Sequence, residues 1–405
     1  MDLTCEELDL SRRKFLTSGL QIGAVMPLLM SGFPQVAFAN MPTDKRLVVL
    51  FLRGGLDSLS AVVPYADKSY ATIREGLAIP ERDEDLIQVT DFFAFNSRLA
   101  GLYDFYQRGE LAVVHAVATP YRDRSHFDAQ DLLENGTNAP HKLRTGWLNR
   151  TIEVMGGAHT PLGLSIGPAV QLMLRGNAQV SSWSPSAFQQ ADEDLIGRIA
   201  TMYQTDPMLG DALQAAAGNM GMAGGGMGRM RGGGNQAFVN MMKATASFLD
   251  KPSGPRIAAV DFNGFDTHVR QQSAGGGRLP NLLEGLSEGI AAYRNDTSDA
   301  VWRDTLIYVV TEFGRTVRPN GSGGTDHGTA SLAMAIGGAI NGGQIIAKWP
   351  GLSERQLYEG RDLAPTHDLR AISKSILVNH YDIPPRVIDK HILPGTRGMH
   401  PTEIL

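Results

Sequence analysis

Cysteine is almost absent from this sequence of 405 residues, because Cys5 is the only one. A chain with one thiol forms no internal disulfide and no cluster of thiolate metal ligands. A surplus of positive charge is also missing, since 37 Lys and Arg face 42 Asp and Glu and the formal net charge is −5. We therefore expect no nucleic-acid partner. No apolar run approaches the roughly 20 residues of a transmembrane helix, so we also expect no stable membrane anchor.

The N-terminus carries a pattern that is typical of export. The motif SRRKFL at residues 11–16 precedes an apolar run from Leu20 to Leu29 and then a small-x-small site at residues 37–39. This order predicts a twin-arginine signal peptide over residues 1–39, with the twin-arginine (Tat) translocase as a partner during export. Removal of this segment would also remove Cys5. We expect a periplasmic or secreted protein, and such export often carries proteins that already hold a cofactor.

Short apolar runs alternate with amphipathic stretches along the rest of the chain. Such runs are typical of buried strands in a parallel sheet, and stretches with a period near 3.6 residues are typical of helices. The alternation predicts an α/β fold, a three-layer α/β/α sandwich with a mostly parallel central sheet. The expected strands are Arg46–Leu52, Leu111–Ala118, Ile257–Phe262, Thr305–Thr311 and Leu332–Ile336. The expected helices are Asn96–Arg108, His126–Glu134, Ala237–Leu249, Leu279–Arg294 and Asp368–Asn379.

The chain after the signal peptide, residues 40–405, is long enough for one large domain. Within it, residues 218–234 read GNMGMAGGGMGRMRGGG. A low-complexity stretch of glycine and methionine is interpreted as a flexible loop or insertion.

Polar side chains gather where the expected strands end. In an open α/β sheet, ligands bind outside the carboxyl ends of the strands, so residues at these positions are candidates for chemistry. We expect them at one edge of the sheet. They are Asp57 and Ser58 after the first strand, Arg122, Asp123, Arg124, Ser125, His126 and Asp128 after the second, Asp261, Asn263, Asp266 and His268 after the third, and Glu312, Arg315, Asp326 and His327 after the fourth.

Two of these candidates also have a purely structural interpretation. Asp57 can cap a turn or the next helix, as aspartate often does. Ser125 and Asp128 have the spacing of a capping box, so Ser125 can equally begin a helix without taking part in chemistry.

The two Asp and His pairs differ in strength as signals. Asp266 and His268 are two residues apart and point to opposite sides if their segment is extended. Asp326 and His327 are adjacent in GSGGTDHGTA, where four glycines leave little packing to gain from a bulky charged pair. We expect these glycines to let the backbone approach a ligand closely.

Carboxylate oxygens and neutral imidazole nitrogens, without thiolates, are ligands that suit zinc, manganese, magnesium or iron(II). Two such ions roughly 4 Å apart can clamp the attacking and leaving oxygens of a phosphoryl-type displacement, and they need on the order of six protein ligands. The candidates at the strand ends are numerous enough to hold two divalent metal ions.

Several blocks of the sequence resemble a known family in the same order. They are FLRGGLDSLSAVVPY, AVVHAVATPYRDRSHFDAQD, GWLNR, FNGFDTH, TEFGRTVRPNGSGGTDHG and AIGGAINGG. The chain is similar in these blocks to bacterial exported proteins with domain of unknown function 1501, a family grouped more remotely with the alkaline phosphatase and sulfatase superfamily. The resemblance implies an alkaline-phosphatase-like fold with two divalent ions. It also implies hydrolysis of phosphate or sulfate esters, with a small anionic ester or a polysaccharide as substrate.

The order of ligands in that superfamily implies a role for each candidate. Ser125 resembles the nucleophile, with Ser58 as its competitor, and Arg122 or Arg124 would grip the anionic oxygens of the substrate. One ion would take Asp57, Ser125, Asp326 and His327, and the other Asp266, His268 and His367. A mature chain without cysteine excludes the formylglycine that sulfatases use.

Three functions stay open at this point. The leading hypothesis is an exported, metal-dependent hydrolase of phosphate or sulfate esters. The alternatives are a non-catalytic metal-binding or polysaccharide-associated protein of the surface or periplasm, and a protein with a purely structural metal site.

Overall fold

The computed structural model describes residues 43–402, except for residues 82–83, 158–160, 186–233 and 401. The predicted signal peptide, 1–39, and almost all of the Gly/Met-rich stretch, 218–234, lie outside the described residues. Among the described residues, no helix has the length and the hydropathy needed to cross a membrane.

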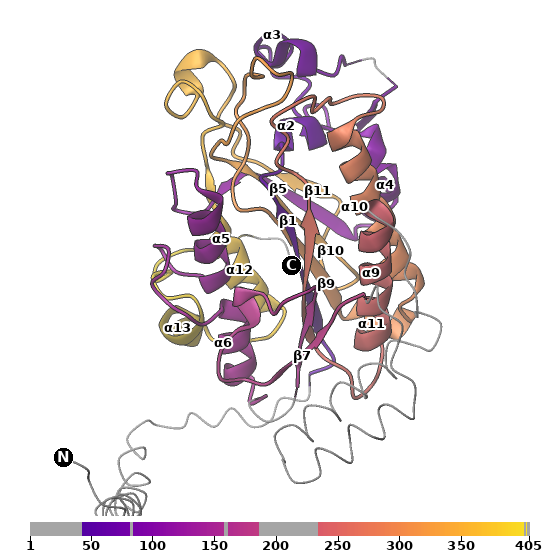
Figure 1. Cartoon of the computed structure of the whole chain (residues 1–405), viewed down its shortest axis with the longest axis vertical. Coiled ribbons are helices and arrows are strands. Elements are labelled where there is room, and N and C mark those ends of the chain that lie inside the picture. Colours follow the sequence, from indigo (N-terminus) through magenta and orange to yellow (C-terminus); the bar gives the residue numbers. More distant parts are fainter. Residues whose placement is uncertain (1–42, 82–83, 158–160, 186–233, 401, 403–405) are drawn as a thin grey trace, which may run out of the picture. The chain divides into compact units, whose positions relative to one another are not determined.

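A nine-stranded sheet runs through the centre of the described chain (Figure 1). Its order is β11-β5-β10-β9-β1-β8-β6-β7, and β12 pairs with β5 beside β11. The strands, in that order, are Gln344–Ile346, Leu111–Ala118, Ser331–Ile336, Thr305–Val310, Arg46–Arg53, Ile257–Asn263, Gly163–Ile166 and Val180–Trp183, with β12 at His367–Asp368. All five strands expected from the sequence are present.

Helices cover both faces of this sheet, so the predicted three-layer sandwich is confirmed (Figure 1). One layer contains α4 (Ala100–Gln107), α9 (Asn235–Leu249), α10 (Arg278–Asn295) and α11 (Asp299–Arg303). The other contains α5 (His126–Asn135), α6 (Trp147–Val154), α12 (Leu369–Asn379) and α13 (Pro385–Val387).

The buried strand β1 shows why both faces need covering. Its sequence RLVVLFLR has apolar residues at successive positions, and successive side chains of a strand point to opposite faces. Leu50 therefore packs in the core on the α9 and α10 side, whereas Phe51 packs on the α5 and α12 side. This makes β1 a central strand, and its parallel partners are β8 and β9.

Strand β10 departs from the sequence prediction, because it is antiparallel to both of its neighbours, β5 and β9. Its apolar sequence resembles that of a buried parallel strand, but no crossover helix separates it from β9. A parallel connection needs such a crossover. The chain instead leaves β9, forms the loop 311–330 outside the sheet, and re-enters from the same edge. The loop with the Asp326-His327 pair is therefore held at the carboxyl edge of the parallel strands.

Several smaller elements lie between β1 and α4 in the chain. Helices α2 (Ser58–Ala61) and α3 (Tyr70–Arg74) follow β1, and a small antiparallel sheet has the order β2-β4-β3. Its strands are Val62–Val63, Ala94–Asn96 and Leu86–Gln88, and the short helix η2 (Ser97–Leu99) continues into α4.

Candidate functional site

Four side chains from three separate segments meet at the carboxyl edge of the sheet. His126 is the first residue of α5, Asp266 and His268 follow β8, and His327 lies in the loop between β9 and β10. Ligand atoms of His126, Asp266 and His327 all lie within 4.8 Å of one another. His268 joins them, since its Nε2 atom is 2.9 Å from Asp266 Oδ1 and 2.9 Å from His327 Nε2. We call these four residues the histidine cluster.

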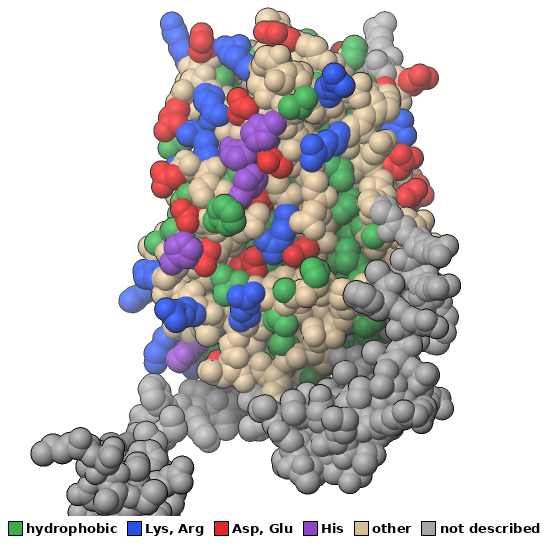
Figure 2. All heavy atoms as spheres, viewed as in Figure 1, with side chains coloured by type: hydrophobic (Ala, Val, Ile, Leu, Met, Phe, Trp, Pro, Cys, Tyr) green, Lys and Arg blue, Asp and Glu red, His purple; other side chains and the backbone are tan. Residues whose placement is uncertain are grey.

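The three imidazole rings are neighbours on one face of the molecule. The ring centroid of His327 lies 4.3 Å from that of His126 and 4.7 Å from that of His268. Phe313 packs behind two of these rings, at 4.8 Å from His126 and 5.0 Å from His327. Figure 2 shows a group of adjacent histidines with acidic side chains among them on the surface. The cluster is therefore supported from inside and reachable from solvent.

Each histidine of the cluster is held through its Nδ1 atom by an oxygen. His327 Nδ1 lies 2.9 Å from the carbonyl oxygen of Arg124, which can only accept a hydrogen bond. His126 Nδ1 lies 2.9 Å from Glu312 Oε1, and His268 Nδ1 lies 3.1 Å from Asp326 Oδ1. Because Nδ1 donates in each case, the Nε2 atom of a neutral ring carries the free lone pair.

Glu312 is the carboxylate that orients His126. Its side chain is buried, and its two oxygens accept hydrogen bonds from the Gly54 and Gly55 amides, His126, Gln130 and Thr311. Burial acts to raise the pKa of Glu312, but these hydrogen bonds, first that of His126, hold it below its ordinary value. Glu312 is thus an ionised acceptor. Its hydrogen bond also raises the pKa of His126, against the opposing effect of burial.

Asp266 supplies the oxygen in the middle of the cluster. Its Oδ1 atom accepts a hydrogen bond from Arg315 at 2.7 Å and lies 3.2 Å from His327 Nε2. Its Oδ2 atom lies 3.5 Å from His126 Nε2. Burial acts to raise the pKa of Asp266, but the hydrogen bond and charge of Arg315 outweigh it, so this carboxylate is ionised. Burial lowers the pKa of His327, which favours the neutral form that binds metal.

The cluster fits a bound cation. Two Nε2 atoms that both carry lone pairs repel each other at the 2.9 Å that separates His268 from His327. The Nε2 atom of His126 is buried and has no hydrogen-bond partner among the described residues. A cation between these nitrogens and the Asp266 carboxylate removes both problems, because every free lone pair then has a positive partner.

The two predicted ligands Asp266 and His268 do reach the same point, although they are only two residues apart. The chain between β8 and α10 is not a regular strand there, so alternation of side chains does not apply. Gly54 allows this path, since a Cβ at that position would lie 2.2 Å from the Asp266 amide nitrogen.

Asp326 contacts the histidine cluster through His268 and is not itself one of its four residues. It is 53% exposed, and its Oδ1 atom accepts from His268 Nδ1 and from Asn320 at 3.0 Å. The hydrogen bond from Asn320, with that from His268, holds the pKa of Asp326 below its ordinary value. In the structure, the adjacent Asp-His pair is split between two tasks: His327 faces the cluster and Asp326 orients a different histidine.

Asp57 is placed in a separate, buried network. It caps α2 by accepting from the Leu59 amide at 3.1 Å, and its other oxygen accepts from Ser60 at 2.9 Å. Arg74 and Gln271 also donate to that oxygen. The side chain is 2% exposed, and Arg74 neutralises its charge. The structural role considered for Asp57 in the sequence is therefore observed.

His367 is also outside the histidine cluster. It lies on β12 beside β5, and its Nδ1 atom is 3.2 Å from the His115 carbonyl oxygen and 3.1 Å from the Thr366 hydroxyl. No hydrogen bond joins it to a cluster residue among those described.

Ser125 is the residue before the cluster histidine of α5. It occupies the N-cap position of that helix, but its side chain makes no capping hydrogen bond, so the capping-box interpretation is not observed. The serine is half-buried, whereas its competitor Ser58 is 2% exposed.

Both arginines predicted to grip an anion are occupied by protein groups. Arg124 pairs with Glu359 at 2.6 Å and with the buried Asp362 at 2.9 Å. Arg122 donates to the carbonyl oxygens of Thr119 and Tyr121.

The residues of the site that were assigned no role in the sequence interpretation include His126 and Glu312. Both stand at expected strand ends, and this position could have identified them as candidates. The hydrogen bond between them could not be predicted, because 186 residues separate them in sequence.

Two of the glycines around the Asp-His pair, Gly324 and Gly328, allow close contact with neighbouring backbone. A Cβ on Gly324 would lie 2.3 Å from the backbone of His268, so the absence of a side chain lets the two loops touch. The glycines were expected to let the backbone approach a ligand, and the close approach observed at Gly324 is to the neighbouring backbone of His268.

Several solved structures are similar to this chain, at low sequence identity. No curated protein matches the chain. Among solved structures, Ps i-CgsB in complex with k-i-k-neocarrahexaose has a TM-score of 0.46 and 9% identity, covering 88% of this chain and 77% of that one. The zinc complex of the C-terminal periplasmic domain of EcEptC from Escherichia coli has a TM-score of 0.39 and 10% identity, covering 85% of each chain. A protein in the alkaline phosphatase superfamily from Vibrio parahaemolyticus has a TM-score of 0.40 and 12% identity, covering 82% of this chain and 65% of that one.

The family itself is identified from the sequence. The family described as "Protein of unknown function (DUF1501)" matches residues 44–392, which include the whole histidine cluster and nearly all of the described chain. The chain belongs to this family.

Proposed function

We propose that the histidine cluster binds a divalent metal ion and that the protein is an exported hydrolase of phosphate or sulfate esters. The observation that carries the proposal is the common orientation of His126, His268 and His327. Each ring is fixed through Nδ1 so that Nε2 faces the ionised Asp266. Orientation of ligand histidines by oxygen acceptors is a regular feature of protein metal sites.

The donor set favours zinc among the metals expected from the sequence. Three imidazole nitrogens and one carboxylate suit zinc, whereas magnesium prefers oxygen ligands and keeps several waters. Manganese is the runner-up. The described residues supply one such cluster, so we propose one ion at this position instead of the two implied by the family resemblance.

The exposure of the ligands supports a role in binding substrate. The side chains of His126 and His327 are 25% exposed, and those of His268 and Asp266 are 38% and 41% exposed. Structural zinc sites have closed coordination and catalytic ones keep a position open to solvent. A rim site that solvent reaches therefore favours the hydrolase over a purely structural ion.

A bound zinc ion supplies Lewis acidity to an ester oxygen at this rim. The chain's own contribution to chemistry is Ser125, which we retain as the nucleophile because it is half-buried next to His126 at the start of α5. Its hydroxyl oxygen would bond to the phosphorus or sulfur atom as the bond to the alcohol oxygen breaks, and the alcohol would leave with the serine proton. Water would then hydrolyse the serine ester, which releases phosphate or sulfate and restores the Ser125 hydroxyl. Ser58 is a poorer candidate, since its burial keeps substrate away.

Metal content of the purified protein tests the site. We expect about one equivalent of zinc in the wild type, and loss of it in His327→Gln. The matched control is His367→Gln, which changes a histidine at the same edge of the sheet that has no contact with the cluster. Retention of zinc by the first variant, or its loss from both, contradicts the proposed ligand set.

Turnover of aryl phosphate and aryl sulfate esters tests the chemistry. The zinc-loaded wild type should hydrolyse one class, and Ser125→Ala should lose most of that activity while Ser58→Ala keeps it. A folded, zinc-loaded wild type that hydrolyses neither class favours a non-catalytic binding protein instead.

A further inference from the structure

A cavity of about 670 Å³ opens beside the histidine cluster. It is formed by three segments, and its lining consists of Gly76, Leu77, Ala78, Arg270, Gln272, Ser273, Ala274, Pro319, Asn320 and Gly323. The volume falls within the range of roughly 300–1,000 Å³ found for small-molecule sites. A single inorganic anion would occupy little of it, so the size points to an organic ligand.

Arg270 is the only charged residue in this lining, and no carboxylate accompanies it. Its side chain is exposed and makes no ion pair or hydrogen bond with any described residue. This distinguishes it from Arg122 and Arg124, whose guanidinium groups are occupied by carbonyl oxygens or carboxylates. A guanidinium in a cavity without a counter-charge is a ready partner for an anion, which it can bind through two parallel hydrogen bonds.

The cavity is directly joined to the proposed metal site. Asn320 lines it and donates through Nδ2 to the His268 carbonyl oxygen at 2.9 Å and to Asp326 at 3.0 Å. Val269 and Gly323 form an antiparallel bridge immediately after His268. The Cα atoms of Arg270 and His268 lie within about 7.6 Å, because only two peptide units separate them. One substrate molecule can therefore contact both places.

The backbone at Arg270 has a conformation that is uncommon for a residue other than glycine. Its φ angle is 47°, in the left-handed region that glycine occupies without strain. A non-glycine residue in such a conformation is a reason to ask what the side chain does.

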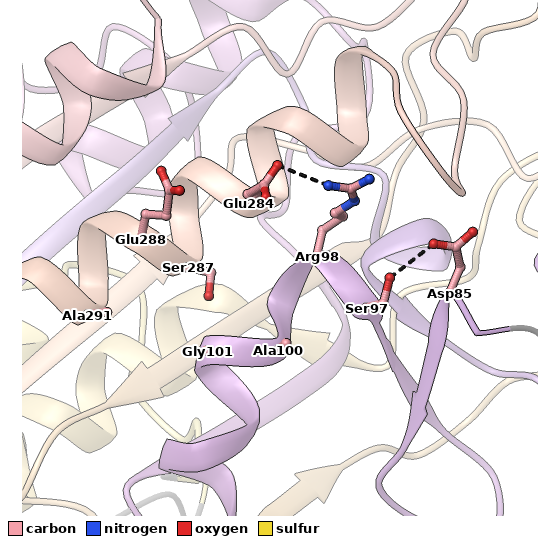
Figure 3. A pocket seen from close by; sticks show the side chains of 9 residues that line it. All are labelled: Asp85, Ser97, Arg98, Ala100, Gly101, Glu284, Ser287, Glu288 and Ala291. Atoms are coloured by element: carbon pink, nitrogen blue, oxygen red, sulfur yellow. Dashed lines mark hydrogen bonds and ion pairs between the residues drawn. The ribbon is translucent and has the colours of Figure 1, made fainter.

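The loop that carries Arg270 is anchored from behind, so the cavity wall is held in place. Asn96 donates to the Ser273 carbonyl oxygen at 2.6 Å. Asp85 accepts from the Gly275 amide at 2.9 Å, and Arg98 donates to the Gly275 carbonyl oxygen at 2.8 Å. Figure 3 shows another pocket, to which Asp85 and Arg98 also contribute; there Arg98 points to Glu284 and Ser97 to Asp85. These four side chains form two pairs, in contrast to Arg270.

We infer that the cavity is a substrate subsite and that Arg270 selects esters that carry a second anionic group besides the one at the metal site. The second group is a sulfate, phosphate or carboxylate on the same organic molecule. The inference deepens the proposed function and rests on it for the identity of the first group. Arg270 is a specificity-determining residue in this scheme and takes no part in bond breaking.

Binding calorimetry with a sulfated disaccharide tests the inference without requiring turnover. The probes are a disulfated disaccharide and its monosulfated and unsulfated counterparts, titrated into the zinc-loaded full-length protein. We expect the wild type to bind the disulfated probe more tightly than the monosulfated one. Arg270→Gly should lower the affinity for the disulfated probe by roughly tenfold to hundredfold, the effect of losing a charged hydrogen bond. The affinity for the monosulfated probe should not change.

The choice of variants separates charge from folding. Glycine suits the φ angle of 47°, so Arg270→Gly should fold, and Arg270→Lys should keep part of the preference. Arg278→Ala removes the same charge from an exposed position at the start of α10 outside the cavity, and it should bind like the wild type. Equal affinity of the wild type for the disulfated and monosulfated probes, or an unchanged preference in Arg270→Gly, overturns the inference.

Failure of the proposed function gives a different pattern. A wild-type protein that holds no zinc, or hydrolyses no ester, contradicts the hydrolase proposal. The preference for a second anion is measured separately, from binding affinities. A preference that persists in zinc-free protein and disappears in Arg270→Gly would support the subsite even then.

Discussion

Asp57 and Asp266 follow neighbouring parallel strands, β1 and β8, yet the structure gives them opposite surroundings. Asp57 is 2% exposed and is neutralised by Arg74, with further hydrogen bonds from Ser60 and Gln271. Asp266 is 41% exposed and stands among histidine Nε2 atoms. One aspartate is closed within a complete network, and the other is open toward three imidazole rings and solvent.

The difference shows that a carboxylate at a strand end is not enough to predict a metal ligand. Its charge partner decides the role. An arginine that reaches the carboxylate first provides the positive charge that a metal would bring, and it fills the oxygen lone pairs. Arg315 does this only in part for Asp266, because the carboxylate keeps its contacts to the three histidines.

The largest expected effect comes from breaking the closed network. Asp57→Ala leaves the fully buried Arg74 without its carboxylate, and removing one partner of a buried ion pair typically costs about 3–5 kcal/mol. We expect a loss of that size in the free energy of unfolding, measured by urea denaturation, with an unchanged zinc content in the folded protein. The control is Asp326→Ala, at a side chain that is 53% exposed, which should cost far less stability. A stable Asp57→Ala protein with reduced zinc would identify Asp57 as a ligand after all.

A buried histidine beside Asp57 should make the stability of the protein depend on pH. His115 is buried beside the Asp57 network, with its Nε2 atom 3.1 Å from the Val62 carbonyl oxygen, and burial lowers its pKa from 6.5 to about 4. The unfolded chain therefore binds the proton first, so stability is full above pH 6.5 and falls as the pH drops toward 4. His115 alone should account for a loss of about 2–3 kcal/mol between pH 7 and 4.5.

The measurement is the free energy of unfolding of wild type and His115→Gln at both pH values. The variant should be less stable at pH 7 but should lose less on acidification. His141→Gln, at a histidine that is 68% exposed, is the control and should follow the wild type. Equal acid sensitivity in the His115→Gln protein would mean that this ring is not kept neutral by burial.

The smallest expected effect distinguishes a ligand from the residue that orients it. In Asp326→Asn, His268 keeps a neutral oxygen acceptor at Nδ1 but loses the charge. Changes behind the ligands typically weaken metal affinity by about 10–100-fold. We expect a zinc dissociation constant raised by that factor in competition with a chelator, and an unchanged free energy of unfolding for the metal-free protein. Asp266→Asn should raise the constant further, and a reversed order would exchange the roles of these two carboxylates.

The fold was predictable because its signals are local. The apolar sequence of β5, Leu111–Ala118, is buried along its whole length, and the predicted bounds match the observed ones. Asp368 stands one residue before α12 and caps it through the Arg370 amide, as an aspartate at that position predicts. The direction of β10 was not predictable from its composition, because the loop before it and not the strand itself sets the direction.

The histidine cluster was predictable in part. Asp266, His268 and His327 were assigned as ligands and do converge, whereas Asp57 and His367 make other contacts. His126 was assigned no role, because the family resemblance assigned the nucleophile to its neighbour Ser125, which stands before the helix. Glu312 and His126, which form a hydrogen bond, lie far apart in sequence, so no local pattern predicts their contact.

The sequence by itself determined the alternation of strands and helices, the placing of acids and histidines at the strand ends, and the membership in a family. Buried apolar runs and helical periods act over a few residues, so they can be read without the fold. Only the tertiary structure decided which carboxylate meets an arginine and which meets imidazoles. Those choices depend on contacts between segments far apart in sequence, such as Asp57 and Gln271, which are 214 residues apart. They also depend on the direction in which β10 brings its loop back to the edge of the sheet.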